Sequence, residues 1–268
     1  MRKLTIDGKE FSIAENFNEL SKDQLQNFIE NFYIVSPRFY MVNDANEVEP
    51  ISFDATNALL YAQLINVLKI DLETFDKLTP EDVVFLIDEM KCIDFLLDDS
   101  NLTINHFPTL NENLVGTEND FASLTAEEFL WAERFYLEYK TTKEIAKLDA
   151  MIACLYKSKN KKNQLLPFEV KRISVLEKYI AKVELNQKIA ILLFFEGCRN
   201  EFPICYPYVY AGKKSDDAGE FKEVLLQVAK DGPFGHFDNV LKTNIHLLFS
   251  ELNRVAKEAI EFERKNKK

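Results

Sequence analysis

Apolar side chains recur at helical spacing in segment after segment of this 268-residue chain, and this pattern constrains the fold more than any other feature. It predicts helices over residues 21–32, 54–69, 79–97, 125–139, 142–155, 170–182, 185–197, 219–230 and 238–264. Strands and helices do not alternate regularly, which argues against a doubly wound parallel sheet. The sequence therefore predicts a mainly α fold with a multi-helix, bundle-like body.

A small β-hairpin is expected at the N-terminus, ahead of the first helix. Residues 3–6 and 10–13 have strand composition and flank Asp7-Gly8, a dipeptide typical of a tight hairpin turn. Later in the chain, Thr125 and Glu128 have the spacing of a capping box, which marks the start of a helix. The hairpin is marginal by itself, so we expect it to pack on the helical body.

The charge of the chain changes sign along its length. Residues 1–140 contain 27 acidic and 10 basic side chains, whereas residues 141–268 contain 17 and 23. This asymmetry predicts an acidic N-terminal lobe over 1–122 and a helical lobe over 123–268, or else one domain with a polar charge distribution. Opposite charges also favour head-to-tail self-association. The net charge of −11 argues against nucleic-acid binding.

Membrane insertion and secretion are not expected. The longest uninterrupted apolar run, Ile189–Phe195, has seven residues, whereas a membrane span needs roughly 20. The N-terminus has no apolar segment typical of a secretory signal. The four cysteines show no C-x-x-C spacing, which favours free thiols in a reducing compartment such as the cytoplasm.

The sequence offers no recognisable catalytic, metal or cofactor site. Seven glycines, without a phosphate-binding pattern, argue against nucleotide cofactors, and three scattered histidines do not have zinc-ligand spacing. His236 lies in a Gly/Pro segment, but no nucleophile or acid can be assigned to it. We therefore expect a protein that is not an enzyme. The alternative is an enzyme whose site assembles from scattered residues around His236.

Two features are candidates for protein interaction. Trp131 lies among aromatic residues, which dominate interface hot spots, although such a stripe also fits a core. Residues 238–264 carry a long apolar stripe that can pack internally or pair with another chain. Its members are Leu241, Ile245, Leu248, Leu252, Val255, Ala259 and Phe262.

Four motifs in a fixed order give the chain a family resemblance. The first is Leu4–Phe11 followed by Asn18–Ser21, and the second is Leu78–Asp82 leading to Phe95-Leu96. The third and most distinctive is Phe129–Tyr136 with Leu148–Tyr156, and the fourth is Ile189–Phe195 followed by Glu196–Arg199. In this order they resemble a family of uncharacterised proteins of Bacteroidetes phages and prophages, encoded in the tail region near the tape-measure gene.

The resemblance implies a non-enzymatic phage tail protein. Such a protein would assist tail assembly by binding the tape-measure protein or another tail protein, as a chaperone does, in the host cytoplasm. One alternative is a structural tail or connector component of the virion. Another is a cytoplasmic protein-interaction module unrelated to the virion. The family has no assigned catalytic residues to transfer to this sequence.

Overall fold

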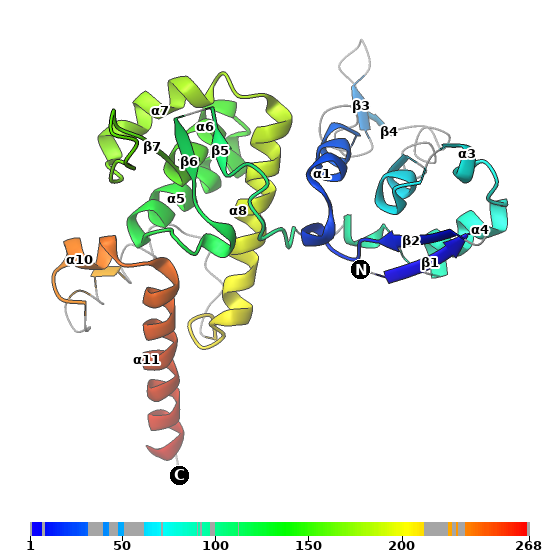
Figure 1. The fold of residues 1–268 in the computed structure, drawn as a ribbon. Helices are drawn as coiled ribbons and strands as arrows, with labels where there is room; N and C mark the ends of the chain where they lie inside the picture. The colour runs from blue at the N-terminus through cyan, green and yellow to red at the C-terminus, as the bar shows by residue number, and fades with distance from the viewer. Residues whose placement is uncertain are drawn as a thin grey trace. The chain divides into compact units, whose positions relative to one another are not determined.

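Helices dominate the structure, which confirms the mainly α fold (Figure 1). The computed structural model describes residues 2–6, 9–31, 40–42, 48–50, 62–70, 72–89, 91, 93–96, 100–111, 113–211, 225–226, 229 and 234–266. The turn predicted at Asp7-Gly8, the start of the helix predicted at 54–69 and most of the helix predicted at 219–230 lie outside these residues.

The described elements are mostly short, apart from three helices. The α-helices are α1 (Lys22–Ile29), α3 (Leu72–Phe75), α4 (Pro80–Val84), α5 (Ala126–Thr142), α6 (Ile145–Leu155), α7 (Ile173–Ile180), α8 (Leu185–Cys205), α10 (Phe237–Lys242) and α11 (Ile245–Asn266). Residues 62–68 are also helical. The strands are β1 (Arg2–Ile6), β2 (Lys9–Ile13), β3 (Tyr40–Val42), β4 (Val48–Pro50), β5 (Thr109–Leu110), β6 (Leu114–Gly116) and β7 (Tyr156–Ser158).

The chain divides into two compact units that interleave in sequence. The first unit comprises Met1–Leu102 and Leu185–Gly197, and the second comprises Thr103–Glu184 and Cys198–Lys268. The sequence placed a boundary between residues 122 and 123, within a polar stretch. In the structure that stretch carries β5 and β6, which pair with β7 in one antiparallel sheet, so residues from Thr103 onward join the second unit.

The first unit contains the predicted hairpin, formed by β1 and β2. The strands are antiparallel, with Arg2 opposite Ile13 and Ile6 opposite Lys9. Helix α1 begins at a capping box in which the Ser21 hydroxyl accepts from the Gln24 amide and the Gln24 side chain accepts from the Ser21 amide. Buried aromatic rings pack behind this helix, with Phe17 edge-on to Phe28 at 5.5 Å between ring centroids.

The helix predicted at 79–97 is much shorter in the structure. Its start is as expected, because the Thr79 hydroxyl and the Asp82 carboxylate form a second capping box. Helix α4 ends at Val84 and passes into a π turn over Phe85–Glu89. Lys91 then adopts a left-handed backbone with φ of 51°, a conformation that a right-handed helix cannot contain.

The second unit is built around the helix pair α5 and α6. The capping box predicted from Thr125 and Glu128 is present, with the Glu128 carboxylate 2.8 Å from the Thr125 amide. Helix α5 ends at Lys143, which is left-handed with φ of 59°, so the next helix begins at Ile145 and not at Thr142 as predicted. Helix α6 is buried from Leu148 onward and packs against both α5 and α7.

Helix α8 is longer than predicted and is shared by the two units. The sequence predicted an end at residue 197, but the helix continues through Pro203 to Cys205. Ile189–Phe195 is buried throughout. At Gly197 the helix passes so close to the backbone of Leu102 that a Cβ atom would lie 2.3 Å from the Leu102 carbonyl oxygen. Only glycine allows this approach.

Candidate protein-interaction surface

The single helix predicted over residues 238–264 is two helices in the structure, α10 and α11. Thr243, between them, has an extended backbone with ψ of 142°, and its hydroxyl bonds to the Asn239 carbonyl at 2.8 Å. The Thr243 carbonyl accepts from the Ala126 amide, and the Ile245 amide donates to the Leu124 carbonyl, each at 2.9 Å. These bonds hold the break against the start of α5.

Asn244 is the residue that starts α11. Its side-chain oxygen accepts from the amides of His246 (3.0 Å) and Leu247 (3.3 Å), two donors that a helix leaves unsatisfied at its N-terminus. Its side-chain amide donates to the Ala122 carbonyl at 2.8 Å. The cap therefore fixes where the helix begins and also how it is attached to its unit.

An aromatic cluster, which we call the aromatic clamp, packs on the first two turns of α11. Phe249 is buried, with its ring 4.7 Å from that of Phe202 and 5.5 Å from that of Tyr206. Tyr210 stacks on Phe249 at 6.2 Å with an interplanar angle of 8°, and Phe129 of α5 meets it edge-on at 6.3 Å. Phe129, Phe202 and Phe249 are buried, so this aromatic clamp attaches the start of α11 to its unit.

His246 adds a polar link to this cluster. Its Nδ1 atom lies 2.8 Å from the Tyr206 hydroxyl, and its Nε2 atom bonds to the Asp120 carbonyl oxygen. A carbonyl oxygen only accepts, so Nε2 carries a proton, and in the neutral imidazole Nδ1 accepts from Tyr206. Burial raises the pKa of the Tyr206 phenol above its ordinary value, which keeps this donor protonated.

Beyond the clamp, the apolar stripe of α11 emerges into solvent. Ile245 and Leu248 are fully buried at 0% exposure, whereas Val255 is 49% exposed and Phe262 is 67% exposed. Leu252 is half-buried and Ala259 is exposed. Figure 1 shows the second part of α11 extending away from the other described helices of its unit. We call Leu252, Val255, Ala259 and Phe262 the outer stripe.

Charged side chains line the outer stripe on one side. Arg254 donates to Glu251 at 2.6 Å and to Glu258 at 2.5 Å, which links side chains over about two turns of the helix surface. Hydrogen bonds from Arg254 lower the pKa of the Glu251 carboxyl, so Glu251 is ionised at neutral pH. The outer stripe is thus a narrow apolar seam with a charged border.

The structure separates four of the stripe residues that the sequence singled out: Leu241, Ile245, Leu248 and Leu252. Ile245 and Leu248 serve the chain's own core, so the internal-packing alternative holds for them and neither offers a surface to a partner. Leu241 is half-buried on α10, a different helix from the rest of the stripe. Leu252 alone belongs to the outer stripe, which also contains Val255 and Phe262.

Trp131 occupies a separate, half-buried position on α5. Its ring lies 6.0 Å from that of Phe135, and the Arg134 guanidinium lies over it at 5.3 Å. These neighbours come from the same helix, so Trp131 and Phe135 form a local aromatic surface next to a charge. The core face of α5 is carried by other residues, including Phe129, Ala132 and Tyr136.

The side chains considered for chemistry do not converge. His236 is exposed in front of α10, whereas Cys154 and Cys198 are buried. Burial raises the pKa of the Cys198 thiol, and the same cause raises that of Cys154, so neither is a ready nucleophile. Among the described residues, no group of three His, Cys, Asp or Glu side chains is placed to hold a metal ion.

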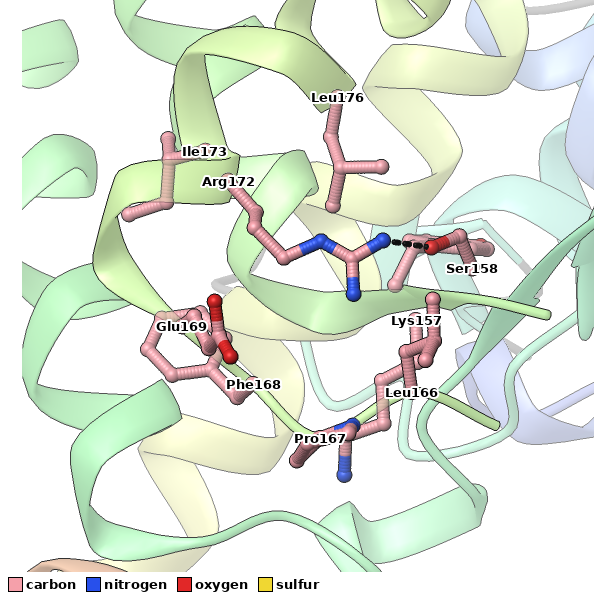
Figure 2. A pocket seen from close by; sticks show the side chains of 10 residues that line it. Lys157, Ser158, Leu166, Pro167, Phe168, Glu169, Arg172, Ile173 and Leu176 are labelled. Carbon is pink, nitrogen blue, oxygen red and sulfur yellow. Dashed lines mark hydrogen bonds between the residues drawn. The ribbon is translucent and has the colours of Figure 1, made fainter. Parts of the chain in front are cut away.

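A small cleft lies between β7, the segment 166–169 and α7 (Figure 2). Arg172 reaches across it to donate to the Ser158 hydroxyl at 2.7 Å. The cleft has a volume of about 10 Å³, enough for one water molecule, whereas sites for small molecules usually occupy several hundred Å³. This cleft is therefore a packing defect at the edge of the sheet and not a ligand site.

Comparison with known proteins adds no relative, because no family model, curated protein or solved structure matches the chain. Within the part of the chain that the structure describes, no helix has the length and apolar character needed to cross a membrane. The outer stripe of α11 remains the surface with the clearest physical reason to bind another protein.

Proposed function

We propose that this chain is a non-enzymatic phage tail protein that assists tail assembly by binding the tape-measure protein or another tail protein. The outer stripe of α11 is the observation that carries the proposal. A helix that exposes Val255 and Phe262 on one face leaves apolar area in water, and an apolar face of a partner helix would cover it.

The order of sequence motifs supports the choice of tail proteins as the partner class. Tape-measure proteins are long and helical, so their apolar faces need cover before the tail polymerises around them. A reversible helix–helix contact through the outer stripe would give that cover and then release it. Binding of this kind requires neither a catalytic group nor a cofactor.

Co-expression with the tape-measure protein that the family resemblance places nearby tests the proposal. We expect the two proteins to co-purify, and we expect the double variant Val255→Asp/Phe262→Asp to lose the complex. Leu247→Asp is the matched control, because Leu247 is 57% exposed on the same helix but outside the outer stripe. Absence of co-purification, with no change in the solubility of the tape-measure protein, would overturn the proposal.

Mass spectrometry of purified phage particles separates the two roles within tail biology. An assembly factor is absent from the particle or present below stoichiometry. Presence at the copy number of a tail ring or connector would overturn the assembly role in favour of a structural virion component. The variant pair described above would still identify the contact surface in that case.

A further inference from the structure

Six apolar residues of α11 follow a heptad pattern, with alternating spacings of three and four residues. The set is Ile245, Leu248, Leu252, Val255, Ala259 and Phe262. This spacing is the signature of a helix that packs lengthwise against another helix. The first two residues pack inside the chain, so the outer stripe is a seam of four residues that lacks a facing helix among the described residues.

We propose that the outer stripe pairs with the outer stripe of a second copy, in antiparallel orientation, to form a two-fold symmetric dimer. This inference rests on the proposed function, because it concerns the same helix. It states that a second copy covers the outer stripe until a tail protein binds there. The second copy keeps the stripe out of water and is exchanged for the tail-protein helix.

One antiparallel register brings all four residues of the seam together. In that register Leu252 lies opposite Phe262 of the second copy, and Val255 lies opposite Ala259 of the second copy. Symmetry repeats both layers. Valine faces the small alanine and leucine faces the large phenylalanine, and the remaining layers of the helix belong to the buried turns. Shifting the register by one heptad loses two of the four layers.

The charged residues beside the seam favour antiparallel pairing over parallel pairing. In this orientation Glu251 flanks Lys265 of the second copy, and symmetry repeats this attractive pair. A parallel pair would instead place Glu258 beside Glu263 of the second copy twice, which is repulsive. The antiparallel dimer has one contact between like charges, in which Glu258 of one copy lies beside Glu258 of the second copy. Arg254, 2.5 Å from Glu258, partly neutralises that contact.

Among the described residues, the rest of the chain leaves the seam accessible. The loop after α8 contacts a different side of the helix, where the Tyr208 amide donates to Asn253 at 2.8 Å. Lys257 lies over the Tyr208 ring at 5.7 Å on that same side. Asn253 and Lys257 are one turn apart and point away from the line through Leu252, Val255 and Ala259. The loop therefore supports α11 on the side that faces away from the outer stripe.

A seam of four layers makes a weak dimer, which suits a surface that must be exchanged. Two-helix contacts of this length are marginal in water, so we expect dissociation at micromolar concentration. Sedimentation equilibrium of the full chain from about 1 to about 200 µM should therefore show a monomer–dimer equilibrium. A single monomeric mass throughout this range would overturn the inference.

Charge reversal tests the pairing. We expect Glu251→Lys and Lys265→Glu each to raise the dissociation constant at least about tenfold, and the double variant to restore it. Glu261→Lys is the matched control, because Glu261 lies on the helix away from the seam. The pairing would be overturned if the single variants left the dissociation constant unchanged, or if the double variant dimerised as weakly as either single variant.

Cysteine cross-linking tests the direction, in a Cys205→Ser background because Cys205 is exposed. Under mild oxidation with diamide, a mixture of Leu252→Cys and Phe262→Cys chains should form the mixed disulfide. Leu252→Cys alone should remain monomeric in denaturing gels. Efficient cross-linking of Leu252→Cys to itself would show a parallel pair and overturn the antiparallel arrangement.

Salt separates this dimer from the head-to-tail association that the charge asymmetry favours. An apolar seam with two charge pairs should survive about 0.5 M NaCl with a modest loss of affinity. Complete dissociation at that salt, with the charge-reversal variants unchanged, would overturn the seam in favour of head-to-tail contacts. Loss of dimer while the tail protein still co-purifies would reject this inference and leave the proposed function intact.

Discussion

The two parts of α11 have similar residues and opposite environments. Ile245, Leu248 and Phe249 lie in the core, whereas Val255 and Phe262 face solvent on the same helix. The stripe itself does not change at residue 250, but its surroundings do. The rings that pack on Phe249 cover only the first two turns, and the later contacts of Tyr208 lie on a different side of the helix. Amphipathic spacing therefore marks a face that needs cover, and tertiary structure decides how much of it the chain covers itself.

The largest effect is expected from truncating the buried Leu248. Truncating the half-buried Leu252, one turn later, gives the comparison. Leu248→Ala should destabilise the second unit by ~3 kcal/mol, because it removes a fully buried side chain and leaves a cavity. Leu252→Ala should cost less than about 1 kcal/mol, since Leu252 is only half-buried. Urea unfolding followed by fluorescence of Trp131, the sole tryptophan, measures both. Equal losses of unfolding free energy would show that Leu248 and Leu252 are buried to the same extent.

The next effect concerns the cap that fixes the buried part. Asn244→Ala removes an acceptor for the amides of His246 and Leu247 and a donor to the Ala122 carbonyl. We expect a loss of ~1 kcal/mol. Asn253→Ala is the control, because Asn253 accepts a single bond, from the Tyr208 amide, on the exposed part of the helix. A larger loss for the control would place the main attachment of α11 at the loop and not at the cap.

Sequence reasoning succeeded where the signal is local. The helix starts predicted at residues 21, 79 and 125 are confirmed, and in the structure each start has a capping box that is complete within four residues. The break before Asn244 was not predictable in this way. Leu241 and Ile245 are four residues apart, so the stripe continues in phase across a break that depends on bonds to Leu124 and Ala126.

The candidate surface was predicted in part for the same reason. The spacing identified the stripe of residues 241–262, and the structure places Leu252 on its outer part. The division between its core and solvent-facing residues depends on Phe202, Tyr206 and Tyr210. Their contacts with Phe249 span about forty residues of chain, a distance at which periodicity carries no information.

A smaller effect is expected from alkaline pH on the buried part. Burial raises the pKa of Tyr206 in the folded chain above the value near 10 of an unfolded tyrosine. The neutral phenol therefore contributes stability that is complete below about pH 10 and is lost as the pH rises through the folded-state pKa. The urea midpoint should fall more steeply above about pH 10 for the native chain than for Tyr206→Phe. Parallel curves would exclude Tyr206 as the group responsible.

The smallest effect is expected from the outer stripe, measured at submicromolar concentration where the chain is monomeric. Val255→Ser/Phe262→Ser should change the free energy of unfolding by no more than about 0.5 kcal/mol, because both side chains are already largely in water. Phe249→Ser, the matched buried change, should cost several times more. A near-neutral double variant that nevertheless loses its dimer and its partner would show that these residues act in binding and not in folding. A destabilisation close to that of Phe249→Ser would place the outer stripe in the core and remove the contrast between the two parts of the helix.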